Sequence, residues 1–127
     1  MSNPGLTKTR TASGAIAARR IVKFTANDGE VAQASAATDK LMGISTIVSA
    51  ASGNRSEHVE EGIALCEFGG VTAPGDPVTS DANGKAILAA PAAGTRMRII
   101  GFSTEVTADG VIAGVKLAPG FMTTPAA

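Results

Sequence analysis

The chain carries one histidine, His58, and one cysteine, Cys66, and these are the side chains best suited to covalent or acid–base chemistry. A cysteine beside an imidazole base is the arrangement of a nucleophilic enzyme. His58, however, is flanked by Glu57 and Glu60 on what reads as a polar strand, which favours a solvated or ion-paired surface histidine. Cys66 lies in the apolar run 63–68, where a buried cysteine ordinarily acts as a small hydrophobic side chain. We therefore expect a protein that is not an enzyme.

The acidic run and the glycine pair of this region do not form the pattern of a metal or cofactor site. Glu57, Glu60 and Glu61 offer carboxylates, but calcium needs about six to eight oxygen ligands and the run lacks EF-hand spacing, so a solvated acidic face is expected. Gly69 and Gly70 precede Val-Thr-Ala-Pro rather than the lysine of a phosphate-binding loop. A single cysteine excludes a disulfide framework and a zinc cluster. The sequence predicts no metal and no cofactor.

Charge is unevenly distributed along the chain although the formal net charge is zero. Residues 1–25 hold five basic residues and no acid, whereas residues 26–70 hold two bases and seven acids. Such a charge dipole suits contact with an acidic protein surface, a neighbouring copy included. Without an aromatic partner or a recognisable motif, direct nucleic-acid binding is not expected. The candidate contact residues are Thr7, Lys8, Thr9, Arg10, Arg19 and Arg20.

Residues 1–12 show no apolar periodicity and are interpreted as an extended N-terminal arm that becomes ordered against a partner. Threonines alternate here with basic residues, a pattern compatible with a strand added to a partner's sheet. Removal of residues 1–11 should then leave the folded domain unchanged. A frayed terminus is the alternative interpretation.

The rest of the chain consists of short extended runs separated by turn residues. Turn chemistry at 27–29, 81–84 and 108–110 predicts hairpins. Gly101 inside a long extended run indicates a bulge. The predicted strands are 20–24, 31–34, 41–48, two short strands within 57–68, 78–80, 85–88, 96–106 and 111–117. With no run at helical period, the pattern predicts an all-β fold, a small antiparallel β-sandwich or barrel.

Length and composition predict a single β domain over residues 13–120, with residues 121–127 as a C-terminal tail. Only four residues are aromatic, so the core must be built from aliphatic side chains and alanine, and a core of small side chains favours association with other subunits. No apolar run approaches the roughly 18 residues that span a bilayer. No secretory signal opens the sequence, so a soluble protein of a reducing compartment is expected, without membrane contact.

The order of the turn motifs resembles that of the head decoration proteins of tailed bacteriophages, also called capsid cement or stabilising proteins. The similarity is carried by Gly-Gly at 69–70, Pro-Gly-Asp-Pro-Val at 74–78 and Ser-Asp-Ala-Asn-Gly-Lys-Ala at 80–86. It extends loosely over most of the chain, through the segments 13–16, 41–44, 61–64, 99–102 and 115–120.

This resemblance implies a protein that is assembled in the host cytoplasm and binds the outer surface of the mature capsid in the virion. The implied partner is the major capsid protein, the implied oligomer is a homotrimer, and the implied function is stabilisation of the capsid lattice. A structural component of the phage tail or baseplate is the alternative, and a hydrolase whose pocket the sequence does not reveal is a second one. The motifs leave open whether residues 1–12 contact the capsid or a neighbouring copy.

Overall fold

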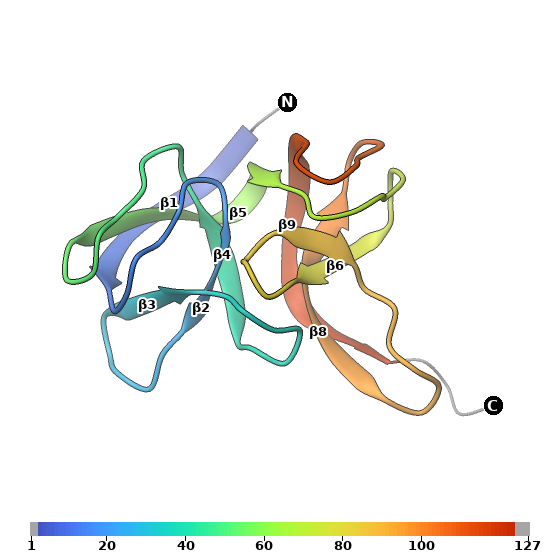
Figure 1. The fold of residues 1–127 in the computed structure, drawn as a ribbon, viewed down its shortest axis with the longest axis horizontal. Coiled ribbons are helices and arrows are strands. Elements are labelled where there is room, and N and C mark those ends of the chain that lie inside the picture. The colour runs from blue at the N-terminus through green and yellow to red at the C-terminus, as the bar shows by residue number, and fades with distance from the viewer. Residues whose placement is uncertain (1–2, 124–127) are drawn as a thin grey trace.

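The computed structural model describes residues 3–123, and every regular element in this range is a β-strand (Figure 1). The all-β prediction is therefore confirmed. No helix that could cross a membrane occurs in this part of the chain. The strands are β1 (Asn3–Ala12), β2 (Ile21–Phe24), β3 (Glu30–Gln33), β4 (Leu41–Ser45), β5 (Arg55–Glu67), β6 (Pro77–Ser80), β7 (Ala86–Leu88), β8 (Arg96–Ser103) and β9 (Ile112–Thr123).

The first half of the chain forms a closed five-stranded barrel. Its strands follow the order β1-β3-β2-β4-β5, and β5 pairs with β1 to close the ring. The two-strand unit β2-β3 arises from the Asn-Asp-Gly turn, as the sequence predicted. The pairing of β1 with β3 is parallel, so this barrel is not purely antiparallel.

The second half of the chain adds a curved sheet of β5, β9, β8, β6 and β7 to the same strand β5. It nearly closes as well, because a bridge joins Phe68, just beyond β5, to Ala86 in β7. The hairpin of β6 and β7 around Asp81 and Asn83 confirms the turn read from the sequence. β5 is thus the strand that both halves share, and the two halves lie side by side in Figure 1.

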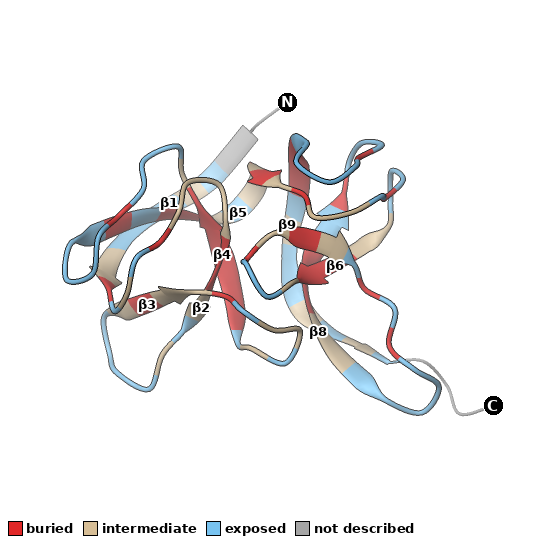
Figure 2. Ribbon diagram, in the orientation of Figure 1, coloured by how far each residue is buried: buried red, intermediate tan, exposed pale blue. Residues whose placement is uncertain are grey.

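Two groups of buried side chains fill these halves (Figure 2). The smaller group, which includes Val22, Val31 and Met42, comes from the barrel strands and the loops between them. The larger group draws on β2, β4, β5 and the strands of the second half, and contains Phe68, Ile44 and Val115 among others. Because β4 contributes to both groups, all of its five residues are buried. This explains why β4 reads as a continuous apolar run rather than an alternating one.

The structure corrects three predicted boundaries. Residues 3–12 are strand β1 of the chain's own barrel, paired with β5 from Asn3 to Thr11, and not an arm that orders only against a partner. Residues 121–123 belong to β9 and not to a tail. Residues 57–67 form one long strand and not two short strands, because Gly62 takes a φ of 89° within β5 without ending it. Residues 1–2 and 124–127, which the predicted arm and tail also included, lie outside the described residues.

Because β1 closes the barrel, deletion of residues 1–11 should destabilise the domain. Several strand hydrogen bonds, each contributing about 0.5–1.5 kcal/mol, are lost together, so the free energy of unfolding should fall by more than about 3 kcal/mol. Urea unfolding of full-length and truncated protein measures the difference. An unchanged unfolding midpoint would contradict this role of β1.

Gly101 interrupts the register of β8 and β9 between Ile99 and Gly101, which confirms the predicted bulge. A Cβ at this position would collide with the backbone carbonyl of Lys116. Gly101→Ala should therefore lower the free energy of unfolding by about 1–3 kcal/mol. Gly14→Ala is the matched control, since a Cβ there meets nothing within 4 Å, and it should change stability by less than about 0.5 kcal/mol.

Candidate functional site

His58 is buried inside the protein, which shows that the predicted surface position was wrong. Its side chain is 0% exposed, and Nε2 lies 2.8 Å from the Glu60 carboxylate. The same carboxylate oxygen accepts a hydrogen bond from Arg10 at 3.2 Å, so His58 shares a carboxylate partner with a basic side chain of β1. Glu60 is therefore only partly exposed and does not belong to the predicted solvated acidic face. Glu57 and Glu61 are exposed.

Cys66 is completely buried in the larger core group, as the sequence predicted. Burial raises the pKa of its thiol to about 12, because a thiolate would lose its hydration. The thiol therefore stays protonated near neutral pH and is a poor nucleophile. The described residues contain no group of three or more His, Cys, Asp or Glu side chains arranged to hold a metal ion.

The six predicted contact residues occupy three different places. Thr7, Lys8, Thr9 and Arg10 lie on β1, where Lys8 and Thr9 are exposed and Arg10 is tied to Glu60. Arg20 lies between the two halves of the molecule. Arg19 lies beside a surface hollow that Thr7 also lines. The structure therefore brings Thr7 and Arg19 together at one hollow, while the Arg20 side chain contacts Asn83 and Glu67.

One edge of β1 is open over most of its length. β5 pairs with β1 on one side from Asn3 to Thr11, but on the other side β3 joins only at Thr11 and Ala12. Among the described strands, none lies beside this edge before Thr11. An open edge offers backbone donors and acceptors to an added strand, while an exposed lysine such as Lys8 discourages indiscriminate pairing.

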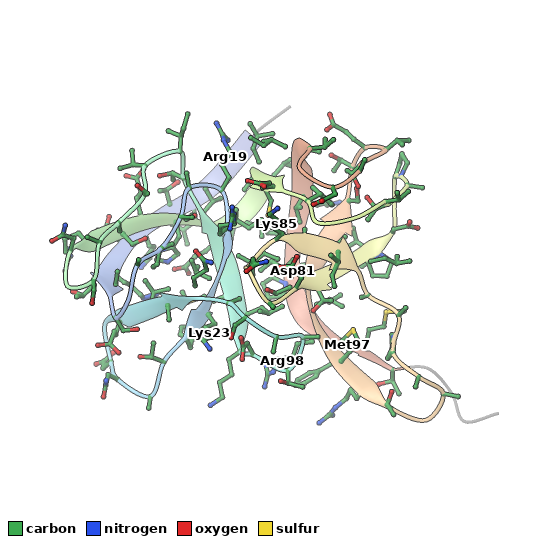
Figure 3. All side chains as sticks on the ribbon, viewed as in Figure 1. Arg19, Lys23, Asp81, Lys85, Met97 and Arg98 are labelled. Carbon is green, nitrogen blue, oxygen red and sulfur yellow. The ribbon has the colours of Figure 1, made fainter. Side chains whose placement is uncertain are left out.

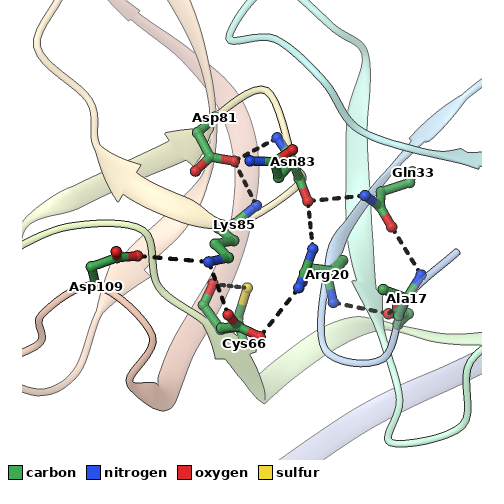
Figure 4. Close-up of polar contacts among 10 residues, drawn as sticks. Ala17, Arg20, Gln33, Cys66, Asp81, Asn83, Lys85 and Asp109 are labelled. Carbon is green, nitrogen blue, oxygen red and sulfur yellow. Dashed lines mark hydrogen bonds and ion pairs between the residues drawn. The ribbon is translucent and has the colours of Figure 1, made fainter.

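A polar junction fixes the turn between β6 and β7 against the barrel (Figure 4). Arg20 donates to the carbonyl of Asn83 at 2.9 Å, and Gln33 donates to the same carbonyl at 2.9 Å. Arg20 also reaches Glu67 at 3.3 Å, and Lys85 reaches the other oxygen of Glu67 at 3.0 Å. Arg20 therefore joins the two halves structurally, which is a different role from the predicted partner contact.

The hollow lies where β1, the end of β4 and the middle of β5 meet, and its volume is about 320 Å³. Much of its lining is apolar, with Ile47, Val59, Ala64 and Leu65, and it also contains Glu57, Thr46 and Ser45 beside Thr7 and Arg19. Ile47 is 69% exposed. Arg19 adopts a φ of 57°, a left-handed conformation that is uncommon outside glycine. Its backbone amide bonds to the carbonyl of Thr46 at 3.0 Å, which fixes this wall of the hollow.

A second surface feature lies on the β8-β9 ribbon and was missed by the sequence analysis. The guanidinium groups of Arg96 and Arg98 lie 4.3 and 4.4 Å from the centre of the Phe121 ring. Arg98 faces Phe121 directly across the two strands, and Phe121 is 51% exposed. The alternation of Arg96 and Arg98 is visible in the sequence, but Phe121 falls within the predicted C-terminal tail, residues 121–127. Only the strand register brings Phe121 to the two arginines.

Comparison with known proteins shows a likeness of fold to a solved structure. The sequence matches no protein-family model and no curated protein. The fold is similar to the crystal structure of the head fiber gp8.5 N base in bacteriophage phi29, with a TM-score of 0.66. The likeness covers 89% of this chain and 93% of that chain, at 16% sequence identity. At this identity the likeness shows a shared fold.

The polar junction around Arg20, Glu67 and Lys85 predicts how the free energy of unfolding depends on pH in the acidic range. The hydrogen bond from Lys85, together with the nearby Arg20, holds the pKa of Glu67 below its ordinary value of 4.5. A lowered pKa in the folded state stabilises the protein fully above pH 4.5, and this contribution disappears as the pH falls through the folded-state value. Glu67→Gln should therefore cost about 1 kcal/mol at pH 7 and progressively less below pH 4.5.

Urea unfolding of wild type and variant between pH 7 and pH 3 measures this difference. Glu61→Gln is the control, because Glu61 is exposed and has no ion pair among the described residues. A Glu67→Gln variant with the wild-type pH dependence would show that the ion pairs of Glu67 add no net stability.

Proposed function

We propose that this protein is a structural protein of a phage head, a decoration or cement protein that binds the outer surface of the mature capsid. The observation that carries the proposal is the likeness to the phi29 head fiber base over 89% of this chain and 93% of that one. The order of turn motifs, which resembles the decoration proteins, supports it independently. The proposed partner is the major capsid protein, and the proposed location is the virion.

The chemistry of the described residues supports a binding role without catalysis. His58 is enclosed and paired with Glu60, and Cys66 is enclosed and protonated, so neither reaches a substrate. What the surface offers instead is the open edge of β1, a hollow and a ribbon with an exposed aromatic ring. These are features of a protein that acts by attaching to other proteins.

Stabilisation would follow from mass action. A protein that binds the expanded lattice and not its dissociated subunits stabilises the lattice by RT ln(1 + [L]/Kd). We also propose a homotrimer, because three linked binding sites gain avidity over one and the Ala-rich core buries little area per residue. The exposed edge of β1, with Lys8 and Thr9, is the proposed contact with the capsid.

A base for a longer head fiber is the second candidate, because the similar phi29 structure is described as such a base. Both candidates attach to the head from outside, and they differ in what the attached protein carries. Electron microscopy of the virion separates them, since a fiber base lies beneath additional projecting density. Density for this chain in the tail or baseplate would contradict both and support the tail alternative.

Binding to undecorated heads tests the proposed β1 contact. Lys8→Glu should weaken binding about threefold to tenfold at low salt, because it replaces an attractive surface charge with a repulsive one. The loss should shrink at high salt as screening increases. Lys116→Glu on β9 is the matched control, with the same charge change at another exposed position, and should bind as wild type does.

Cosedimentation of each protein with expanded heads at low and high salt gives the affinities. Equal affinities for wild type and both variants would remove the β1 edge from the proposed interface. Absence of any binding by the wild-type protein would contradict the decoration function itself.

A further inference from the structure

We propose that the Arg96–Phe121–Arg98 cluster of one copy inserts into the hollow beside Arg19 of a second copy, and that repetition of this contact closes a ring of three. The inference names the interface of the proposed trimer and rests on it, but it does not depend on capsid binding. Each copy contributes a donor surface and an acceptor surface.

The donor surface is an exposed aromatic ring held between two cations. Phe121 is 51% exposed, and its ring lies 4.3 and 4.4 Å from the guanidinium groups of Arg96 and Arg98. Neither arginine has a carboxylate partner within the described residues 3–123. Aromatic and arginine side chains together are typical of the residues that dominate protein interfaces. The arginines fix the ring in one orientation, so little conformational freedom remains to be lost on binding.

The acceptor surface is the hollow of about 320 Å³, which is large enough for one phenyl ring. Ile47, Val59, Ala64 and Leu65 provide its apolar wall. Ile47 is 69% exposed and its neighbour Val48 is 67% exposed, so the rim of the hollow is an apolar surface without cover in the single chain. Insertion buries the exposed half of the Phe121 side chain and makes it the anchor of a larger contact.

Charge complementarity identifies the occupant as another copy of this chain. The hollow contains the exposed carboxylate of Glu57. Glu57 has no ion pair among the described residues. Two arginines without carboxylate partners around a ring thus complement one unpaired glutamate in an apolar hollow. Arg19 also lines the hollow, so the incoming arginines must approach on the Glu57 side.

The positions of the two surfaces favour a ring over a symmetric dimer. Arg19, beside the hollow, lies in the upper part of the view in Figure 3, and Arg98, on the ribbon, lies in the lower part. A two-fold dimer would need the cluster and the hollow of each copy to meet those of the other copy at one interface, whereas separate contacts are heterologous and build closed rings when the rotation between neighbours closes. In a ring of three copies, each arginine–phenylalanine cluster occupies the hollow of the next copy, so one kind of interface uses all of these surfaces.

Sedimentation velocity over a micromolar concentration range tests the ring with a matched pair of aromatic variants. Phe121→Ala should raise the trimer dissociation constant about tenfold or more. Phe102→Ala is the control, since Phe102 lies on the same sheet with 37% exposure but outside the cluster, and it should leave the trimer intact. Urea unfolding of both variants confirms that the domain stays folded. A wild-type monomer, or an intact trimer for Phe121→Ala, overturns the inference.

Charge reversal tests the pairing itself. Arg96→Glu combined with Arg98→Glu should dissociate the trimer, and so should Glu57→Arg alone. All three changes in one chain should restore the trimer at least in part, because the two surfaces become complementary again. Dissociation without any restoration overturns Glu57 as the acceptor and with it the proposed contact.

Parallel binding measurements separate this inference from the proposed function. If the Arg96→Glu and Arg98→Glu variant stays trimeric but no longer binds heads, the ribbon contacts the capsid and the inference is wrong. If wild type binds a single-stranded oligonucleotide and this variant does not, the ribbon is a nucleic-acid site and the inference is again wrong. A trimer disrupted as predicted in a protein that never binds heads supports the inference and contradicts the proposed function.

Discussion

The pairing of β5 on both of its edges is the constraint on which the rest of the structure depends. β5 spans residues Arg55–Glu67, closes the barrel through β1 and carries the second sheet through β9. Its buried His58 is held through Nε2 by Glu60, whereas His58 Nδ1 and the Ser56 hydroxyl, also buried on β5, have no hydrogen-bond partner among the described residues. Loss of β1 therefore opens the barrel and exposes one edge of the strand that also supports the other half. The N-terminal segment is consequently part of the fold as well as part of the surface.

Polar contacts also join the two halves. These contacts matter for the fold because the core consists mostly of small side chains. The turn between β6 and β7 reaches across to Arg20 and Gln33 through the carbonyl of Asn83, and Glu67 accepts from both Arg20 and Lys85. Most buried side chains here are aliphatic or alanine, and Phe68 is the only one of the four phenylalanines that is fully buried. Directional contacts fix the relative placement of the halves where nonpolar packing alone would leave it less specific.

The proposals about assembly rest on groups that the fold leaves without partners. The open edge of β1, the apolar rim of the hollow and the two arginines on Phe121 each lack a counterpart in the described part of the chain. The arginine cluster lies on the β8-β9 ribbon, whereas the hollow and the open edge share strand β1, with Thr7 lining the hollow. Such a division of surfaces is consistent with the proposed head protein.

The sequence by itself determined the fold class and most turns, because glycine, proline and asparagine act locally. The Asn-Asp-Gly and Asp-Ala-Asn-Gly hairpins, the bulge at Gly101 and the burial of Cys66 follow from properties of a few adjacent residues. Tertiary structure alone decided the rest, since it depends on residues far apart in the chain. The pairing of β1 with β5, the burial of His58 and the meeting of Phe121 with the two arginines arise from long-range strand register, which no local pattern encodes.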